Sequence, residues 1–186
     1  MAANDNNSLI FNCVVTDGMG MYSELDFPNH PKWPAKMHAG SLNATIDRSG
    51  FPAALEKIKH DGYGVQKLDS KTFAPLFTIK QEDIGNNSLG PTSYNPERGT
   101  AQIWACHVSA PSASIEFNAW AVRRIGSAYS NVIEIMSDKH LRKTYGLKND
   151  MPIIVKLYAG EQDGTAEQQQ QPAQTGWRAK LKNILG

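Results

Sequence analysis

The sequence has few cysteines, no long apolar run and no excess of charge of either sign. Its two cysteines, Cys13 and Cys106, lie far apart among apolar neighbours and form no CxxC pair. They are expected to be two buried thiols, although the sequence does not exclude a disulfide between them. Nothing in the sequence points to an oxidising compartment. No apolar run approaches the roughly 18 residues that a membrane-spanning helix needs. We accordingly expect no transmembrane segment and a cytoplasmic location.

The balance of charge and the missing motifs argue against several classes of function. Lys and Arg number 19 against 18 Asp and Glu, which gives a formal net charge of +1. This balance lacks the dense basic footprint of nucleic-acid-binding proteins, so we expect no nucleic-acid partner. A phosphate-bearing small ligand stays open, because one site needs only a few local charges and backbone N–H groups. The chain also lacks the GxxxxGK[ST] phosphate loop, the HExxH zinc motif and the GxSxG nucleophile motif.

The histidines show no spacing that is typical of metal ligands. Each is expected to be a surface or packing residue rather than a ligand. They are His30, His38, His60, His107 and His140.

Short β-type segments separated by turn residues run through most of the chain. They are rich in β-branched and aromatic residues and are bounded by Gly, Pro, Asn and Asp, which is typical of strands. The segments cover residues 9–16, 42–46, 73–79, 101–108, 115–122, 132–136 and 153–158. Many short strands of this kind favour a mainly β fold built as a small barrel.

One or two short helices are predicted beside the strands. Pro52 lies near the start of a helical turn or two over residues 51–58. Residues 137–145 form the second helix, with Ser137 or Asp138 as its N-terminal cap and a glycine after its end.

The two ends of the chain differ in composition from the segment between them. Residues 1–8 are polar and are expected to be a disordered leader, residues 9–160 the barrel domain, and residues 161–175 a Gln-rich linker. Residues 176–186 restore a helical spacing of apolar residues and predict a short basic amphipathic helix at the end of a flexible tail. It could dock on a protein partner, a membrane surface or the barrel, or stay frayed. The Gly-, Asn- and Pro-rich residues 85–99 predict a long loop.

A glycine turn follows the first predicted strand. Gly18, Met19 and Gly20 form a GxG pattern, in which backbone N–H groups can approach a phosphate closely because no Cβ intervenes. A plain tight turn is the more common origin of such a pattern.

Ser41 and Asn43 flank Leu42 in the second predicted strand. Because side chains alternate along a strand, both should face one side while Leu42 faces the core. A hydroxyl and an amide oxygen so placed could hold Mg²⁺, which prefers oxygen ligands and keeps several waters. A polar barrel rim is the alternative.

Charged residues in the last third of the chain are further candidates. Glu134 interrupts the apolar strand at residues 132–136, and a carboxylate buried there needs a partner or a ligand. An exposed position on an edge strand is the alternative. Arg142, with Lys139 and His140 near it, could bind phosphate beside the short helix, although basic residues are common on surfaces.

Taken in order, these segments resemble the archaeal-type CTP-dependent riboflavin kinases. The resemblance spans roughly residues 9–158. Residues 39–43 are similar to the family's G-T-L-N segment, and residues 18–20 are placed like its GxGEG loop. The remaining similarity is to the family's IEII–P–LR–LxLKDGD–V–I run, and it covers residues 132–136, 141–142, 145–150 and 153–155.

The resemblance implies a six-stranded cradle-loop barrel that transfers a phosphoryl group from CTP to riboflavin and gives FMN and CDP. It implies that Ser41 and Asn43 hold Mg²⁺, and that Ser127 and Glu134 contact the flavin. Catalysis would then consist mainly of positioning and of charge neutralisation at the phosphates. The implied nucleotide-binding residues are Gly18, Met19, Gly20, Lys139, His140, Leu141 and Arg142.

The chain also departs from the family pattern. Met21 and Tyr22 stand where the family has Glu-Gly, and Met151 and Pro152 replace residues of a tight turn in the family. Residues 59–100 match no part of the family pattern. A relative that has lost catalysis and binds a small ligand or a protein is therefore the alternative, because a fold does not carry function without its site.

Overall fold

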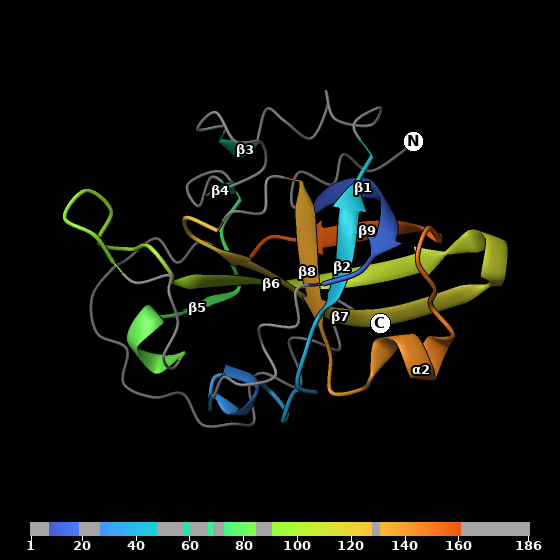
Figure 1. The fold of residues 1–186 in the computed structure, drawn as a ribbon, viewed down its shortest axis with the longest axis horizontal. Coiled ribbons are helices and arrows are strands. Elements are labelled where there is room, and N and C mark those ends of the chain that lie inside the picture. The colour runs from blue at the N-terminus through green and yellow to red at the C-terminus, as the bar shows by residue number, and fades with distance from the viewer. Residues whose placement is uncertain are drawn as a thin grey trace.

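The computed structural model describes residues 8–18, 27–47, 58–59, 67–68, 73–84, 91–127 and 131–160. Seven strands form its main sheet (Figure 1). They are β1 (Ser8–Thr16), β2 (Leu42–Ile46), β5 (Phe77–Ile79), β6 (Ala101–Ala110), β7 (Ile115–Arg124), β8 (Val132–Met136) and β9 (Pro152–Tyr158). A two-stranded sheet pairs β3 (Ile58–Lys59) with β4 (Lys67–Leu68). The helical elements are η2 (Phe27–Asn29), η4 (Gln81–Asp83), η5 (Pro111–Ala113) and α2 (Leu141–Tyr145).

Six of these strands close into an antiparallel barrel, as the sequence predicts. The order is β6-β7-β8-β2-β1-β9, and β9 pairs back onto β6. The long strand β6 shares one edge between two partners, since Ala105 to Ser109 pair with β9 and Ala101 to Ile103 pair with β5. The short strand β5 is therefore an extra strand that extends the sheet beside the closed barrel.

The barrel interior is filled by alternate residues of its strands. Phe117, Ala119 and Ala121 of β7 point inward, and the small alanines leave room for larger side chains from β6, such as Trp104. Phe73 stacks on Trp104 with ring centroids 6.4 Å apart. This period of two is what a closed sheet with one buried face requires.

The helix over residues 137–145 is shorter than the sequence predicts. Its first helical residue is Leu141, because Ser137 and Asp138 bond to each other and the Ser137 carbonyl accepts the backbone N–H of His38. The predicted N-terminal cap is therefore wrong. The end is as expected, because Gly146 takes φ +66° and closes the helix through a backbone bond to Arg142.

Several predicted segments lie outside the described residues. These are the leader up to residue 7, most of the helical turn at residues 51–58, the linker at 161–175 and the C-terminal helix at 176–186. Residues 58–59, the end or neighbour of that helical turn, belong to the strand β3. Of the predicted loop at residues 85–99, the part from residue 91 onward is described and consists of turns and bends.

A second apolar cluster lies on the outside of the barrel, under residues 27–37, here called the strap. Trp120 and Val122 of β7 alternate with the inward-facing alanines and so face this outer layer. Trp33 is the centre of the layer, with ring centroids 5.4 Å from Phe77 and 6.1 Å from Trp120. Its indole N–H donates to the carbonyl of Phe27 at 2.8 Å, which satisfies the only polar atom of a buried side chain.

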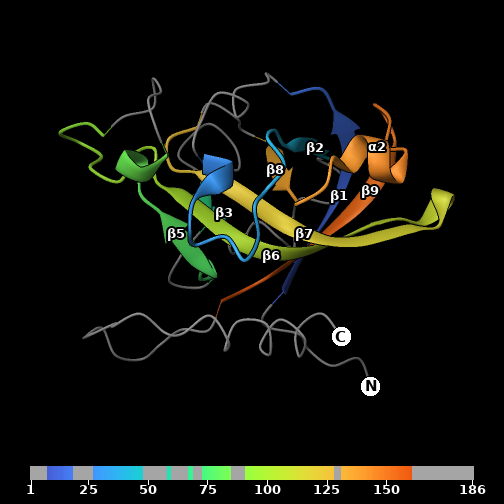
Figure 2. The same ribbon diagram turned by 90° about the horizontal axis from the view of Figure 1, so that it is seen from below.

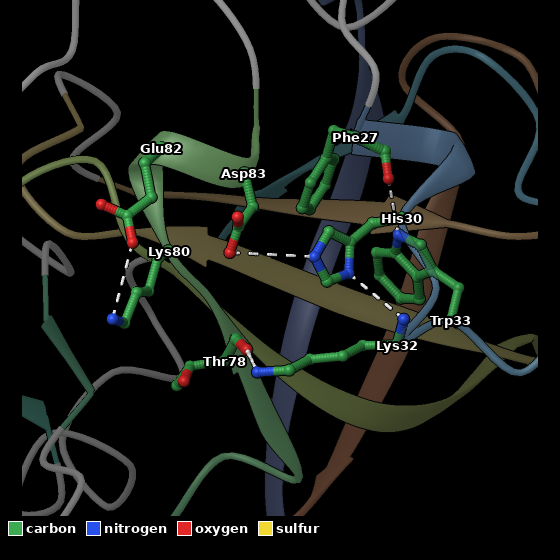
Figure 3. Close-up of polar contacts among 8 residues, drawn as sticks. All are labelled: Phe27, His30, Lys32, Trp33, Thr78, Lys80, Glu82 and Asp83. Atoms are coloured by element: carbon green, nitrogen blue, oxygen red, sulfur yellow. Dashed lines mark hydrogen bonds and ion pairs between the residues drawn. The ribbon is translucent and has the colours of Figure 1, made fainter. Parts of the chain in front are cut away.

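Polar contacts fasten the strap to β5 and η4 (Figure 3). The Lys32 ammonium donates to the carbonyl of Thr78 at 2.6 Å. The backbone N–H of Lys32 donates to Nδ1 of His30 at 3.2 Å, and Nε2 of His30 lies 3.9 Å from Oδ2 of Asp83. The strap ends at Met37, so these contacts fix the direction in which the chain enters β2.

The first prediction concerns the pH dependence of the strap. Burial lowers the pKa of His30 from its ordinary 6.5; Asp83 partly offsets this effect and Lys32 adds to it. The folded chain therefore holds this proton less tightly than the unfolded chain, and stability should fall as the pH drops through about 6.5.

Urea unfolding at about pH 7.5 and about pH 5.5 should show a smaller acid-induced loss of stability in His30→Gln than in the wild type. His107→Gln, which alters a more exposed histidine, is the matched control. An acid-induced loss in His30→Gln as large as in the wild type would contradict the assignment.

The second prediction concerns the cysteines, which are two free, buried thiols, as expected from the sequence. Burial raises the pKa of the Cys13 thiol to about 12, and burial also raises the pKa of Cys106. Since the thiolate is the reactive species, neither should react with a thiol reagent in the folded protein at mildly alkaline pH. Both should react in concentrated guanidinium chloride. Fast reaction of either thiol under native conditions would show that the barrel interior opens readily.

Candidate functional site

A hollow of about 190 Å³ lies at one end of the barrel and is here called the end hollow. At this end β2 begins and β8 ends, and Arg142 of α2 contacts the end of β1, which Figure 2 shows near that helix. Its apolar floor is made by Leu42, Ile135 and Leu141, which are all buried. Its rim comes from two segments that are far apart in the sequence, residues 38–41 and 137–142.

Five residues singled out from the sequence line the end hollow together. The four nucleotide-binding candidates at positions 139–142 sit on its α2 side, and the magnesium candidate Ser41 sits on its β2 side. Leu141 is buried in the floor, whereas Lys139 is exposed at the rim. The structure therefore brings four of the seven predicted nucleotide residues and one of the two predicted magnesium ligands to one place.

Asn43 lies next to the end hollow, on the outer face of the barrel. Leu42 and Ala44 face the core, so strand alternation turns Asn43 outward, where it is only 2% exposed. Its Oδ1 accepts a hydrogen bond from Oγ of Ser41 at 3.2 Å. In the pairing of β2 with β8, Asn43 stands opposite Glu134, which is 6% exposed.

Gly18 packs directly against the side chain of Asn43. A Cβ on Gly18 would lie 3.2 Å from both Oδ1 and Nδ2 of that amide, which is tighter than ordinary contact. The absence of a side chain at Gly18 thus allows the end of β1 to approach Asn43. Met19 and Gly20, the other two residues of the predicted glycine turn, lie outside the described residues.

Ser127 lies at the other end of β8. It follows β7 in a turn, where its backbone N–H donates to the carbonyl of Arg124 at 3.1 Å. The neighbouring Gly126 sits against the side chain of Arg98. Because β8 runs from Val132 near this turn to Met136 at the end hollow, the structure does not bring Ser127 to the other candidates.

The Ser41 and Asn43 oxygens have a spacing that fits a magnesium ion. Two adjacent corners of a Mg²⁺ octahedron with bonds of about 2.0–2.1 Å lie about 3 Å apart, and the two oxygens are 3.2 Å apart. Neither donor is charged, and the described residues contain no group of three or more His, Cys, Asp or Glu that could hold a metal. An ion here would therefore depend on phosphate oxygens and water for its other ligands.

Arg142 both lines the end hollow and ties α2 to the end of β1. Its Nη2 donates to the carbonyl of Thr16 and to Oδ1 of Asn149, each at 2.8 Å, and lies 3.5 Å from Oδ1 of Asp17. Nη1 and Nε have no partner among the described residues. One guanidinium can thus hold the wall of the hollow and still offer donors to an anion.

His38 is a lining residue that the sequence did not point to. It precedes β2, and its ring lies against that of His140 with centroids 4.8 Å apart and planes at 51°. The two residues meet only because β2 and β8 pair in the barrel. No local sequence signal places the two histidines together.

No protein-family model and no curated protein matches this chain. The similarity to the riboflavin kinases therefore stays a prediction from sequence motifs. Within the described residues, no helix has both the length and the apolar character to cross a membrane.

The third prediction tests the contact between Gly18 and Asn43. Gly18→Ala should push the buried amide aside and lower the free energy of unfolding by about 1 kcal/mol, as overpacking does. It should also shift the side-chain amide signals of Asn43 in an NMR spectrum.

The control is Gly126→Ala at the other end of β8. It places an alanine in the left-handed backbone region, at φ +76°, which strains the backbone. The new methyl group does not contact the Asn43 amide. Unchanged Asn43 signals in Gly18→Ala would show that the two residues do not pack as described.

Proposed function

We propose that the end hollow binds the phosphates of a nucleotide together with Mg²⁺, and that the protein transfers a phosphoryl group to riboflavin or a similar small alcohol. One observation carries the proposal. Residues chosen from sequence motifs alone, Ser41 and residues 139–142, line the same hollow, with Asn43 and Glu134 next to it. CTP is the donor implied by the family resemblance, and FMN would be the product with riboflavin.

Each residue has a role that its position supports. Lys139 would neutralise phosphate charge at the rim, as would Nε and Nη1 of Arg142, which have no partner among the described residues. Ser41 Oγ and Asn43 Oδ1 would hold Mg²⁺, which supplies further charge neutralisation at the phosphate oxygens. Phosphoryl transfer needs little more than positioning and such neutralisation.

Glu134 is the candidate for orienting the acceptor alcohol. It stands opposite Asn43, one strand away from the proposed metal ligands, and is almost fully buried. A carboxyl group has oxygen atoms that accept hydrogen bonds, so it can hold a hydroxyl group in one direction. Ser127 has no such role in the proposal, because it lies at the far end of β8.

A second candidate function is a catalytically inactive binding module for a small ligand or a protein. The position of Arg142 favours it, since Nη2 is committed to Thr16, Asn149 and Asp17 and so serves the structure. Under either function we propose a cytoplasmic protein with no nucleic-acid partner. A protein partner for residues 176–186 belongs to this second candidate and stays a prediction.

The fourth prediction is that the purified protein forms FMN from riboflavin and CTP in the presence of Mg²⁺. FMN formation would be measured by chromatography with fluorescence detection. Ser41→Ala and Asn43→Ala should each lower turnover at least about tenfold, the usual effect of disturbing a metal site. Ser112→Ala and Asn118→Ala make the same chemical changes at exposed positions and should leave turnover unchanged. Circular dichroism would check that all four variants are folded.

The result with other nucleotides separates the two candidate functions. Failure to form FMN with CTP, ATP and GTP would contradict the kinase. Stabilisation by a nucleotide would then support the binding module, since a ligand at about 100 times its dissociation constant adds roughly 2.7 kcal/mol. If the protein neither forms FMN nor is stabilised by a nucleotide, the end hollow is not a nucleotide site.

A further inference from the structure

We infer that His38 is a phosphate-binding residue that works as a pair with His140, and that the end hollow recognises the polyphosphate chain of its ligand rather than a base. The inference rests on the proposed nucleotide site and names the part of the ligand that this site takes. It adds a residue that no sequence motif indicates.

The backbone at His38 and at the residue before it is held in place. The N–H of Met37 donates to the carbonyl of Pro28 at 3.0 Å, and the N–H of His38 donates to the carbonyl of Ser137 at 2.7 Å. The strap and the end of β8 therefore fix the position of His38 before any ligand arrives. A pre-positioned donor costs little entropy when it binds.

The rings of His38 and His140 differ from those of the other described histidines. His30 is engaged by Lys32 and Asp83, and His107 lies 3.9 Å from Glu116. The rings of His38 and His140 contact each other, but neither has a hydrogen-bond or ion-pair partner among the described residues. His140 precedes α2 without capping it through its side chain. Among the described histidines, the two whose rings have no hydrogen-bond or ion-pair partner are thus the two that line the end hollow.

The part of the end-hollow lining that the structure describes is rich in donors and contains no carboxylate. Two imidazoles, Lys139 and Arg142 line it, together with Ser41, and no Asp or Glu is among the lining residues of the described chain. Three carboxylates lie near the hollow without lining it: Asp138 accepts from Oγ of Ser137, Asp17 lies 3.5 Å from Nη2 of Arg142, and Glu134 stands opposite Asn43. Such a set of donors suits an anion with several oxygens.

The size of the end hollow limits what it can take. Its volume of about 190 Å³ is below the roughly 300–1,000 Å³ of sites that enclose a whole small molecule. It has room for phosphate groups, and the ribose and base would extend beyond it. Binding at the end hollow should therefore depend on the polyphosphate and be similar for different bases.

The test is calorimetric titration of the full-length protein with inorganic pyrophosphate and with CTP, both in the presence of Mg²⁺. His38→Phe keeps an aromatic ring against His140 and removes the ring N–H donors. It should weaken the binding of pyrophosphate and of CTP by about tenfold each, the effect of losing one hydrogen bond to a charged group. His140→Phe should do the same from a different element, and His107→Phe is the matched control.

The outcomes separate this inference from the proposed function. Wild-type affinity for pyrophosphate in both His38→Phe and His140→Phe would overturn the paired site. Binding of CTP without any binding of pyrophosphate would overturn polyphosphate recognition, and in both cases FMN formation would still support the kinase. If neither CTP nor pyrophosphate binds and no FMN forms, both proposals fall. A melting temperature near that of the wild type shows that a variant is folded. If His38→Phe does not fold, the test uses His140→Phe in its place.

Discussion

The pairing of β2 with β8 is the constraint on which the candidate site depends. Leu42 stands opposite Ile135 and Asn43 opposite Glu134. Because strand side chains alternate, burying Leu42 and Ile135 in the core forces the two polar residues onto the outer face. A slip of one residue would put Asn43 into the core and expose Leu42, so core burial itself holds the register. The site geometry is thus a by-product of the packing that stabilises the barrel.

The outer apolar cluster under the strap holds the rim of the end hollow in place. β6 pairs with both β9 and β5, and β5 gives the strap an aromatic and polar surface to bind. Trp33 anchors the strap there, and the strap leads directly into His38 and Ser41. On the other side, Arg142 ties α2 to the end of β1. Both walls of the hollow are therefore fastened to the barrel by contacts outside it.

The strands could be predicted from the sequence because their β-branched and apolar alternation is a local signal, and the barrel strands appear close to the predicted positions. The grouping of Ser41 with residues 139–142 followed from motif order. The strap could not be predicted, because Trp33, Phe77 and Trp120 meet only in the folded chain. The contact of His38 with His140 has the same origin. The start of α2 was misplaced because Ser137 bonds to its neighbour Asp138 and, through its carbonyl, to His38 instead of capping a helix.

The most direct measurement of the central claim is an NMR titration of the labelled full-length protein with CTP and Mg²⁺, followed through backbone amide signals. The account predicts that the largest shifts fall on residues 38–43 and 139–142, which line or adjoin the end hollow. The signals of His107 and Ser127, which are not among the lining residues, should stay in place. Shifts confined to residues away from the end hollow, or no shifts at saturating nucleotide, would contradict it.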